Sequence, residues 1–384
     1  MIGDIPPPIS GPEILFQKLI NSRIRDYFQL RVFGFRLNQD NATRGDLHPR
    51  KILQFFLNLR EFRDLLQHFP AEYVSYSFSQ TLPGFMKDFA VILMIKPWCR
   101  KLILHMQGSN FNLFYARQAW PVRFIIRHTL NSAAVVFVQS ECISENLAGI
   151  VKPDKIHVLY NTLDKNELTP LTRAKPQMGM NVLFLANLSF SKGYHDTLRA
   201  IPYVIKEVPD VIFSFAGAHV KLSDERNIKP KDICAGVERL VADAHTIEQR
   251  YANHIRYLGV VTGYDKEAAW RQCDVFVLPS YSESFPTSVL EAMGHGLPVV
   301  TTPVGANCDI FAATPEILVE PGNPIQLAHA IVTLLRSKTL REKYGDLNYN
   351  LVQHKFTIDH VADQFRKAVL YNHGSGEFDE HPAI

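Results

Sequence analysis

The sequence is poor in cysteine and has no long apolar run. Its cysteines are widely spaced, odd in number and form no Cys-x-x-Cys pair; they are Cys99, Cys142, Cys234, Cys273 and Cys308. Such scattered thiols give neither a disulfide framework nor a zinc site, and they fit a reducing compartment. The longest apolar run, residues 89–95, falls far short of the roughly 20 residues that cross a bilayer. Because residues 1–10 also lack the apolar core of a signal peptide, we expect a cytoplasmic protein.

Acidic residues are missing from one stretch of the chain. Residues 89–140 contain no Asp or Glu, but they contain Lys96, Arg100, Lys101, Arg117, Arg123 and Arg127, with Trp98, Phe111, Phe114, Tyr115, Trp120 and Phe124 interleaved. Basic and aromatic side chains together suit anionic lipid head groups, and such binding would place the protein on the inner face of a membrane. The same side chains could instead bind a phosphorylated acceptor. The alternative is that the aromatic residues are core and the basic residues are a solvated face. A net charge of only +3 and the lack of a nucleic-acid motif argue against nucleic acid as a partner.

Two further absences limit the chemistry. No Gly-x-Gly-x-x-Gly fingerprint is present, which counts against a nicotinamide enzyme. No constellation of His, Cys, Asp and Glu has the spacing of metal ligands. We therefore expect no bound cofactor and no metal.

Short apolar, β-branched runs alternate with amphipathic helical stretches along the chain. The runs are residues 102–105, 134–139, 155–159, 182–186, 211–216, 255–258, 275–278 and 298–301. Runs that are apolar on both faces suit a buried parallel sheet, and their alternation with helices predicts βαβ units. We expect an α/β protein with two doubly wound Rossmann-like domains that face a cleft.

The predicted domains follow from composition. Residues 164–180 are rich in Pro, Thr, Lys and Gln and have no apolar period. We expect a first domain over 1–168, a linker over 169–180, and a second domain over 181–357. A helix over 358–371 and a disordered tail over 372–384 complete the prediction. Only Met1 and Ile2 precede Gly3, so either the first strand is very short or the true start lies upstream.

The most informative segment follows the strand predicted at 275–278. It has a loop with Glu283, Ser284 and Phe285, then a helix from Thr287 that carries Glu291. Free backbone N–H groups at a helix start suit a diphosphate. A loop carboxylate can accept hydrogen bonds from sugar hydroxyls, and a helix carboxylate can bind a ribose diol. One segment thus offers receptors for sugar, phosphate and ribose, although two solvated surface glutamates are the alternative.

A second segment, residues 184–193, reads as a strand, a loop and a helix start. Lys192 lies near that helix start, where its charge could stabilise a diphosphate leaving group. The alternative is a solvated lysine beside a glycine turn.

The Glu-x₇-Glu spacing, together with residues 291–300 (EAMGHGLPVV), resembles the retaining glycosyltransferases of the GT-B fold, family 4. The resemblance covers nearly the whole chain and is strongest over residues 181–322. It implies a metal-independent enzyme whose Glu283 and Lys192 lie at the reacting sugar and diphosphate. Many members have Arg where this chain has Asn187. The resemblance therefore implies that Asn187 binds the donor in place of that arginine.

The resemblance extends to the first domain with departures. The loop of residues 6–11 resembles the family's first loop, which ends in glycine and approaches the diphosphate. Gly11 is the candidate for that close approach. Pro12 stands where the family usually has a second glycine. Residues 102–111 resemble its His-x-His-Gly stretch, which implies roles for His105 and Gln107. Gln107 stands where the family has His, and it can bond a hydroxyl but cannot titrate. A core histidine is the alternative for His105.

The sequence therefore predicts transfer of a sugar from a nucleoside-diphosphate sugar to a hydroxyl of a sugar or lipid-linked acceptor, as in bacterial surface polysaccharide or glycolipid synthesis. Because Asn187, Gln107 and Pro12 depart from the family pattern, a nucleotide-sugar-binding subunit with little activity remains an alternative. A GT-B epimerase or phosphorylase is another.

Overall fold

The computed structural model describes residues 1–2, 11–34, 49–69, 71–170, 179–220 and 235–371. The chain divides into two compact units. Unit 1 contains Met1–Gln139, Ser144–Tyr160 and the segment that starts at Asp359, and unit 2 contains Ser140–Ile143 and Asn161–Ile358. Each unit is described by itself below.

Unit 1 is built on a parallel sheet in the order β1-β2-β3-β4. Its strands are β1 (Ala71–Phe78), β2 (Cys99–Met106), β3 (Val135–Val138) and β4 (Ile156–Val158). All four residues of β3 are buried, as expected where helices cover both faces of a sheet. Ser75 lies opposite Ile103, and Ile103 lies opposite Val135.

Ile2 extends this sheet beyond β1. It forms parallel bridges with Tyr76 on one side and with Phe33 on the other. The spatial order is therefore Phe33, Ile2, β1, β2, β3, β4, and the direction of the connections reverses between Ile2 and β1. Among the described residues, Ile2 therefore occupies the position of the first strand predicted from the sequence.

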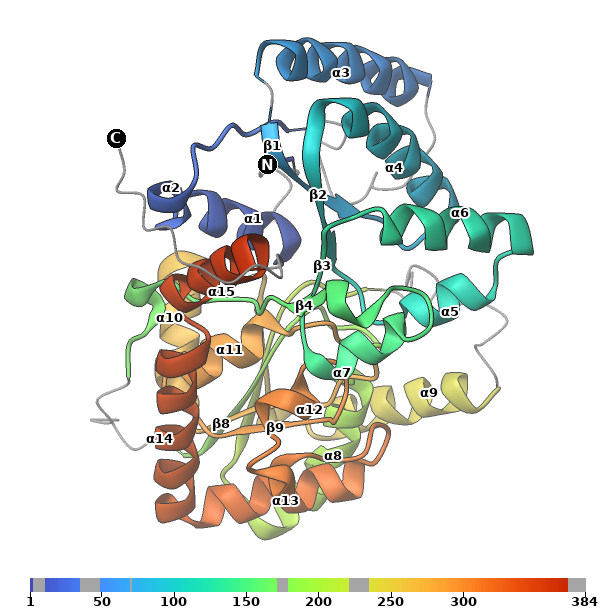
Figure 1. Ribbon diagram of the computed structural model, residues 1–384. Helices are drawn as coiled ribbons and strands as arrows, with labels where there is room; N and C mark the ends of the chain where they lie inside the picture. The colour runs from blue at the N-terminus through green and yellow to red at the C-terminus, as the bar shows by residue number, and fades with distance from the viewer. Residues whose placement is uncertain (3–10, 35–48, 70, 171–178, 221–234, 372–384) are drawn as a thin grey trace. The chain divides into compact units, whose positions relative to one another are not determined.

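Helices cover both faces of the unit 1 sheet (Figure 1). They are α1 (Gly11–Ile20), α2 (Ile24–Tyr27), α3 (Pro49–His68), α4 (Leu82–Ile95), α5 (Phe111–Ala116), α6 (Trp120–Asn131) and α15 (Ile358–Tyr371), with short 3₁₀ turns η1 (Lys96–Trp98), η2 (Glu145–Leu147) and η3 (Pro153–Lys155). One face buries Val361, Phe365 and Val369 of α15 against Ile103 and Phe137. The C-terminal helix, predicted at its observed bounds, therefore belongs to the core of the unit that begins the chain.

Unit 2 has a parallel sheet in the order β7-β6-β5-β8-β9. Its strands are β5 (Asn181–Leu185), β6 (Ile212–Ala216), β7 (Ile255–Gly259), β8 (Val275–Leu278) and β9 (Val299–Thr301). The chain runs from β5 outward to β7 and then returns to β8, so β5 and β8 flank the point where the strand order reverses. Ligands of doubly wound sheets bind at the carboxyl ends of the strands at such a point.

The helices of unit 2 are α8 to α14, together with the first three residues of α7 (Glu141–Ser144). Their bounds are α8 (Tyr194–Glu207), α9 (Ala235–Arg250), α10 (Gly263–Gln272), α11 (Thr287–Gly294), α12 (Asn307–Ile310), α13 (Pro324–Arg336) and α14 (Lys338–Lys355), with 3₁₀ turns η4 (Lys165–Glu167), η7 (Ala252–His254) and η8 (Pro315–Ile317). In the sequence α13 follows the sheet, but in the fold it packs beside α8 (Figure 1).

The strands expected from the sequence coincide with β2 to β9 within two or three residues at each end. Strand β1 was not expected from the sequence, because its serines alternate with aromatic residues and break its apolar run. The units divide between Tyr160 and Asn161, ahead of the predicted linker. Residues 171–178 of that linker and the predicted tail over 372–384 lie outside the described residues.

Candidate functional site

The loops that follow β5 and β8 form the candidate site of unit 2. The first loop leads through Asn187 and Lys192 into α8, and the second leads through Glu283 into α11. Tyr281 joins the two loops: its N–H donates to the Ser191 carbonyl at 2.9 Å and its hydroxyl donates to Asp196 at 2.6 Å. Its ring also stacks on Phe190, with centroids 4.8 Å apart.

Lys192 and Glu283 meet between these loops. Lys192 Nζ lies 2.7 Å from Glu283 Oε1, and the same oxygen accepts a hydrogen bond from Ser280 Oγ at 2.7 Å. The Glu283 side chain is buried, whereas the Lys192 side chain is 30% exposed. The carboxylate is therefore held in a fixed orientation, and the ammonium group beside it remains accessible to an anion.

Two glycines allow this close approach of the loops. Gly193 has φ +74°, and a Cβ there would lie 2.1 Å from the Pro279 carbonyl oxygen. Gly305 has φ +57°, and a Cβ there would lie 2.1 Å from the Glu283 carbonyl oxygen. Both the left-handed backbone and the missing side chain are needed at each position. The positions of Lys192 and Glu283 thus depend on residues that make no polar side-chain contact themselves.

The backbone after Glu283 is held from both sides. Ala306 donates its N–H to the Ser284 carbonyl at 2.9 Å, and Asn161 Nδ2 donates to the Phe285 carbonyl at 3.0 Å. The Phe285 ring is buried edge-on against Phe356, with centroids 5.6 Å apart. Phe285, predicted to bind substrate, therefore anchors the loop through its side chain.

Helix α11 begins at Thr287, as predicted, and carries Glu291 one turn further along the same side. The first backbone N–H groups of a helix have no helical acceptor and suit an anion. Glu291 Oε1 accepts a hydrogen bond from Lys266 Nζ of α10 at 2.6 Å, and its side chain is 14% exposed. Asn187 is exposed in the loop after β5.

Sequence reasoning missed several residues that shape this site. Ser280 and Lys266 bond the two glutamates, and Asp196 bonds Tyr281. Burial raises the pKa of Asp196, while hydrogen bonds from Tyr281 and Arg199 act in the opposite direction. The local pattern does not reveal Lys266 and Asp196, because their partners lie 25 and 85 positions away.

In unit 1 the predicted residues lie at β2 and α1. Gly11 is the first residue of α1, and the loop over 3–10 lies outside the described residues. Gln107 follows β2, and its Nε2 donates to Ser77 Oγ at 3.4 Å. The predicted His105 and Gln107 are therefore both at the carboxyl end of the sheet, where ligands of this architecture bind.

His105 is part of the aromatic core. It is buried, its Nε2 lies 2.8 Å from Ser75 Oγ, and its ring centroid lies 5.1 Å from that of Phe137 and 6.1 Å from that of Phe365. Burial, aided by the charge of the Met1 amine, lowers the pKa of His105 to about 4. The imidazole is neutral near pH 7, and this environment favours the alternative of a core histidine.

Among the helices that the structure describes, none has the length and apolar character needed to cross a bilayer. The same residues contain no group of three or more His, Cys, Asp and Glu side chains arranged to hold a metal ion.

Comparisons with known proteins bear on unit 2 most directly. Residues 179–337 match the family model described as glycosyl transferases group 1. Spore coat protein SA of Bacillus subtilis (strain 168) is 30% identical over 185 residues, which are 47% of this chain and 46% of that protein. Phosphatidyl-myo-inositol mannosyltransferase of Mycobacterium leprae (strain TN) is 32% identical over 186 residues, 47% of this chain and 44% of that protein. The chain thus spans about half the length of these curated relatives.

The structural similarity to known proteins covers more of the chain than the sequence match does. The crystal structure of Anabaena HepE in complex with UDP superimposes with a TM-score of 0.69 at 16% identity, covering 96% of this chain and 98% of that one. The prediction of the GT-B fold is therefore confirmed, and the recognition of the group 1 family is confirmed over the matched residues.

Proposed function

We propose that the chain is a retaining glycosyltransferase that uses a nucleoside-diphosphate sugar, because residues 179–337 match the model of the group 1 glycosyl transferases. Its product would be a surface polysaccharide or a glycolipid of a bacterium. The mannosyltransferase similar to this chain acts, by its name, on a phosphoinositide lipid, and HepE binds UDP. Both support a sugar-nucleotide donor and are compatible with a lipid-linked acceptor.

One observation carries this proposal: Lys192, Glu283 and the start of α11 lie together at the reversal point of the unit 2 sheet. We assign the diphosphate to Lys192 and the backbone N–H groups of the first turn of α11 from Thr287. Glu291 is assigned to the ribose hydroxyls. Asn187 and Ser284 lie on the two loops that flank this position and are assigned to the donor as well.

Glu283 is assigned to a hydroxyl of the donor sugar. Its Oε1 already accepts from Lys192 and Ser280, so Oε2 is the oxygen that we assign to the sugar. A carboxylate held in this orientation is better suited to position the sugar than to act as a nucleophile. Glycosidases differ in using two carboxyl groups across the scissile bond.

Retention would then follow from attack on the face that the diphosphate leaves. The acceptor oxygen forms its bond to the anomeric carbon as the bond to the diphosphate breaks, and the acceptor proton passes to a departing phosphate oxygen. Lys192 would stabilise the negative charge that develops on that phosphate. No residue of this chain needs to form a covalent intermediate.

A panel of nucleoside-diphosphate sugars, screened by thermal shift and then by transfer to lipid-linked and soluble acceptors, tests the proposal. A cognate donor should raise Tm, because a ligand that binds only the folded state stabilises it. The linkage of the product, determined by NMR, should keep the donor's anomeric configuration. An inverted product would refute retention, and binding without transfer to any acceptor would favour the binding-subunit alternative.

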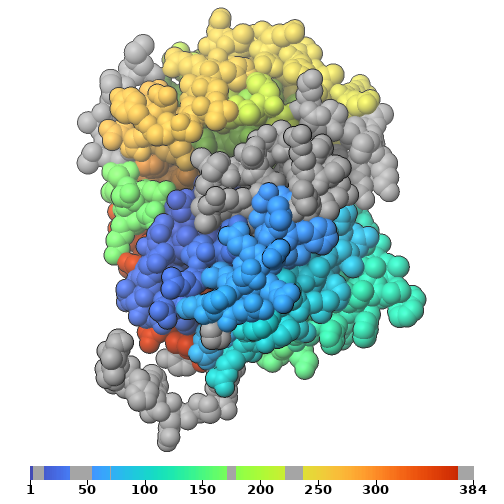
Figure 2. Space-filling view, turned by 90° about the horizontal axis from the view of Figure 1, so that it is seen from above, coloured from blue at the N-terminus to red at the C-terminus, as the bar shows by residue number. Residues whose placement is uncertain are grey.

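We also propose that unit 1 rests on an anionic membrane surface through α4 to α6. Trp120 and Phe124 are 80% and 67% exposed, and they share one side of α6 with Arg123 and Arg127 because the four recur three and four residues apart. On α4 the exposed Leu82, Met86 and Leu93 also share one side. Figure 2 shows α3 and α4 (blue to cyan) as one continuous surface. Exposed aromatic residues beside arginines suit lipid head groups, and this position would bring the enzyme to a lipid-linked acceptor on the cytoplasmic side.

Vesicle co-sedimentation tests this surface. The wild type should bind vesicles that contain phosphatidylglycerol better than pure phosphatidylcholine vesicles, and less so at high salt. Arg117→Gln/Arg123→Gln/Arg127→Gln and, separately, Trp120→Ala/Phe124→Ala should reduce binding. A matched triple variant of exposed unit 2 arginines, Arg239→Gln/Arg250→Gln/Arg256→Gln, should not. Equal partitioning of all these variants would remove the membrane surface from the proposal.

A further inference from the structure

A pocket of about 580 Å³ lies in unit 1 between the C-terminal part of α6 and the loop that leads to β4. Helix α6 contributes Phe124, Arg127, His128 and Asn131 to its lining, and the loop contributes residues 149–153. Strand β3 begins shortly after α6 ends, and β4 begins directly after the 3₁₀ turn η3 of this loop. Because β2, β3 and β4 are parallel, the pocket lies at the amino end of the sheet, opposite to the carboxyl end that carries Gln107.

One side chain fixes the shape of this pocket. Asn131 Nδ2 donates to the carbonyls of Arg127 and Ile150, both at 2.7 Å, and Asn131 Oδ1 accepts the N–H of Lys152 at 3.0 Å. The loop is therefore held against the end of α6. Ile150 and Val151 of the loop are buried and make part of the lining apolar.

The charged residues of the lining are all basic. Arg127, His128 and Lys152 are exposed, and no ion pair joins Arg127 or Lys152 to another residue in the described part of the chain. Burial lowers the pKa of Lys155, the charge of Lys152 lowers it further, and the charge of Asp154 acts in the opposite direction. The two lysines therefore repel each other, and an anion bound at the pocket would relieve this repulsion.

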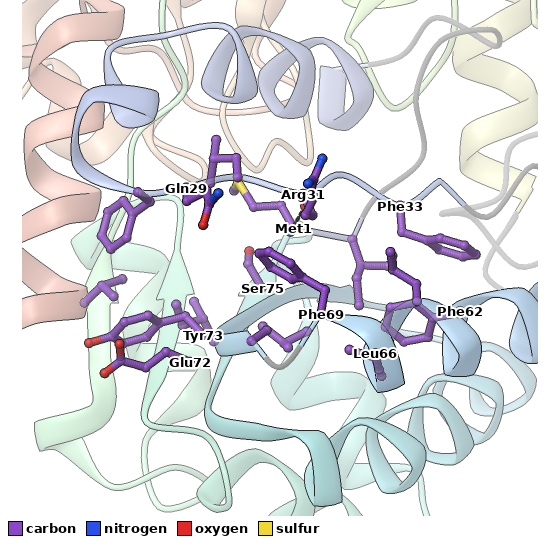
Figure 3. Close-up of a pocket in the computed structure, with 18 of the residues that line it drawn as sticks. Met1, Gln29, Arg31, Phe33, Phe62, Leu66, Phe69, Glu72, Tyr73 and Ser75 are labelled. Carbon is purple, nitrogen blue, oxygen red and sulfur yellow. Dashed lines mark hydrogen bonds between the residues drawn. The ribbon is translucent and has the colours of Figure 1, made fainter. Parts of the chain in front are cut away.

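A second pocket of unit 1, beside β1, does not share this charge. Its lining contains Glu72 as well as Arg31, and the Arg31 guanidinium lies over the Phe69 ring at 5.4 Å from its centroid. Figure 3 shows Arg31 and Glu72 in this pocket among mainly apolar side chains. Charged residues of one sign therefore distinguish the pocket at α6 from the pocket beside β1.

The occupant of the pocket at α6 has to match both its basic and its apolar groups. The exposed Phe124 ring stacks on His128, with centroids 6.1 Å apart, and offers an apolar surface beside Arg127. Inorganic phosphate would use the charges alone. A phospholipid has an anionic phosphate joined to glycerol and acyl groups, so it can use both. Trp120, which is exposed on the same side of α6 as Phe124, continues this surface toward the start of the helix.

We propose that this pocket binds the phosphate group of one membrane phospholipid, with Arg127 and Lys152 on the phosphate and Phe124 beside the glycerol and the first acyl carbons. The inference rests on the membrane surface proposed above, which supplies the lipid. The bound lipid is an anchor and not the acceptor, because the pocket lies at the amino end of the sheet. It would hold α6 against the bilayer at one defined position, whereas general attraction between exposed arginines and an anionic surface is screened by salt.

Water-soluble lipids test the pocket without a bilayer. Dihexanoylphosphatidylglycerol, kept below its critical micelle concentration, should bind the full chain at a saturable site in isothermal titration calorimetry. Glycerol 3-phosphate and inorganic phosphate carry the anion without acyl chains, so they should bind more weakly by about tenfold or more. Equal affinity for the lipid and for inorganic phosphate would overturn a phospholipid as the occupant.

Variants locate this binding. Arg127→Gln/Lys152→Gln should weaken binding of the lipid by about tenfold or more, because both charge-assisted contacts with the phosphate are lost. Phe124→Ala should weaken binding of the lipid but not that of inorganic phosphate. The control Arg60→Gln/Arg63→Gln removes the same charge from exposed positions of α3 and should not change the affinity. Unchanged lipid affinity in Arg127→Gln/Lys152→Gln, or an equal loss in the control, would overturn the pocket.

Vesicle co-sedimentation separates this inference from the membrane surface on which it rests. A wild type that binds anionic vesicles but not the short-chain lipid would overturn the pocket and leave the membrane surface intact. A wild type that binds the short-chain lipid but no vesicles would refute the membrane surface, and with it a membrane lipid as the occupant. Binding to both, with loss of the short-chain lipid in Arg127→Gln/Lys152→Gln, is the expected result.

Discussion

The carboxyl ends of the two sheets differ in charge. In unit 2 this edge holds the Lys192–Glu283 ion pair. In unit 1 the predicted residues there are the neutral Gln107 and a buried His105, whose pKa is lowered to about 4. The nearby carboxylate of Asp88 is buried and accepts hydrogen bonds from Tyr76 and Ser79. The two edges have the same architecture but offer different chemistry.

This difference shows how two domains of the same architecture can bind different substrates of one reaction. A diphosphate is charged and needs cations and helix N–H groups, which unit 2 offers. A sugar hydroxyl is neutral and is recognised by amides and hydroxyls, which unit 1 offers at Gln107 and Ser77. In the proposed function, unit 2 stabilises the negative charge that develops on the departing diphosphate, and unit 1 binds a neutral acceptor hydroxyl.

The strongest way to break the comparison is to remove the charge of Glu283. Glu283→Ala should lower kcat for transfer by about 10² to 10³-fold, typical of lost positioning or electrostatic groups, while the Kd for donor changes less. Steady-state transfer and calorimetric donor binding measure both values. Glu342→Ala, at an exposed glutamate paired with Lys338 on α14, is the control. Wild-type activity in Glu283→Ala would contradict the site.

Lys192→Met tests the cation of the same pair. The methionine keeps the length of the side chain but removes its charge, so the departing diphosphate loses its stabilisation and kcat should fall about 10²-fold. Binding of the nucleoside diphosphate product should weaken as well. Lys206→Met, on an exposed position of α8, should leave both values unchanged. A Lys192→Met enzyme with normal kcat would make the charge of this edge irrelevant to transfer.

Glu291→Gln separates nucleotide binding from chemistry. The amide retains one acceptor but loses its charge and its ion pair with Lys266, so the Kd for the donor should rise about tenfold while kcat changes little. Glu207→Gln, which breaks an exposed ion pair with Arg336, is the matched control. If kcat fell instead with Kd unchanged, Glu291 would belong with Glu283 at the reacting sugar.

The fold was predictable where local pattern determines it. Buried parallel strands are apolar on both faces, so β2 to β9 stand out, whereas β1 has Ser75 and Ser77 between aromatic residues and does not. The C-terminal helix was predicted with the bounds that the structure shows. Its periodicity identifies an apolar face, but not the strands against which that face packs. That α15 packs in unit 1 beside β2 and β3 is a property of the whole chain.

The candidate site was predictable where one short segment contains it. The loop and helix from Glu283 to Glu291 are continuous in sequence, so their adjacency needs no tertiary information. The Lys192–Glu283 pair joins residues 91 positions apart and depends on β5 lying beside β8. Lys266 is one of several lysines on exposed helices, and only packing reveals that it bonds Glu291. The variants above test whether both contacts serve the transfer reaction.

The smallest expected effect sharpens the comparison from the side of unit 1. In the folded chain the pKa of His105 is about 4, against about 6.5 for an unfolded histidine, so the unfolded state binds more protons between these values. The contribution to stability is complete above about pH 6.5 and is lost as pH falls toward 4, a change of up to about 3 kcal/mol. His105→Gln should flatten the slope of unfolding free energy over this window, measured by urea denaturation, whereas the exposed His68→Gln should not. If His105→Gln left that slope unchanged but removed a pH dependence that wild-type transfer shows, His105 would titrate in the reaction, and the unit 1 edge would be as ionisable as that of unit 2.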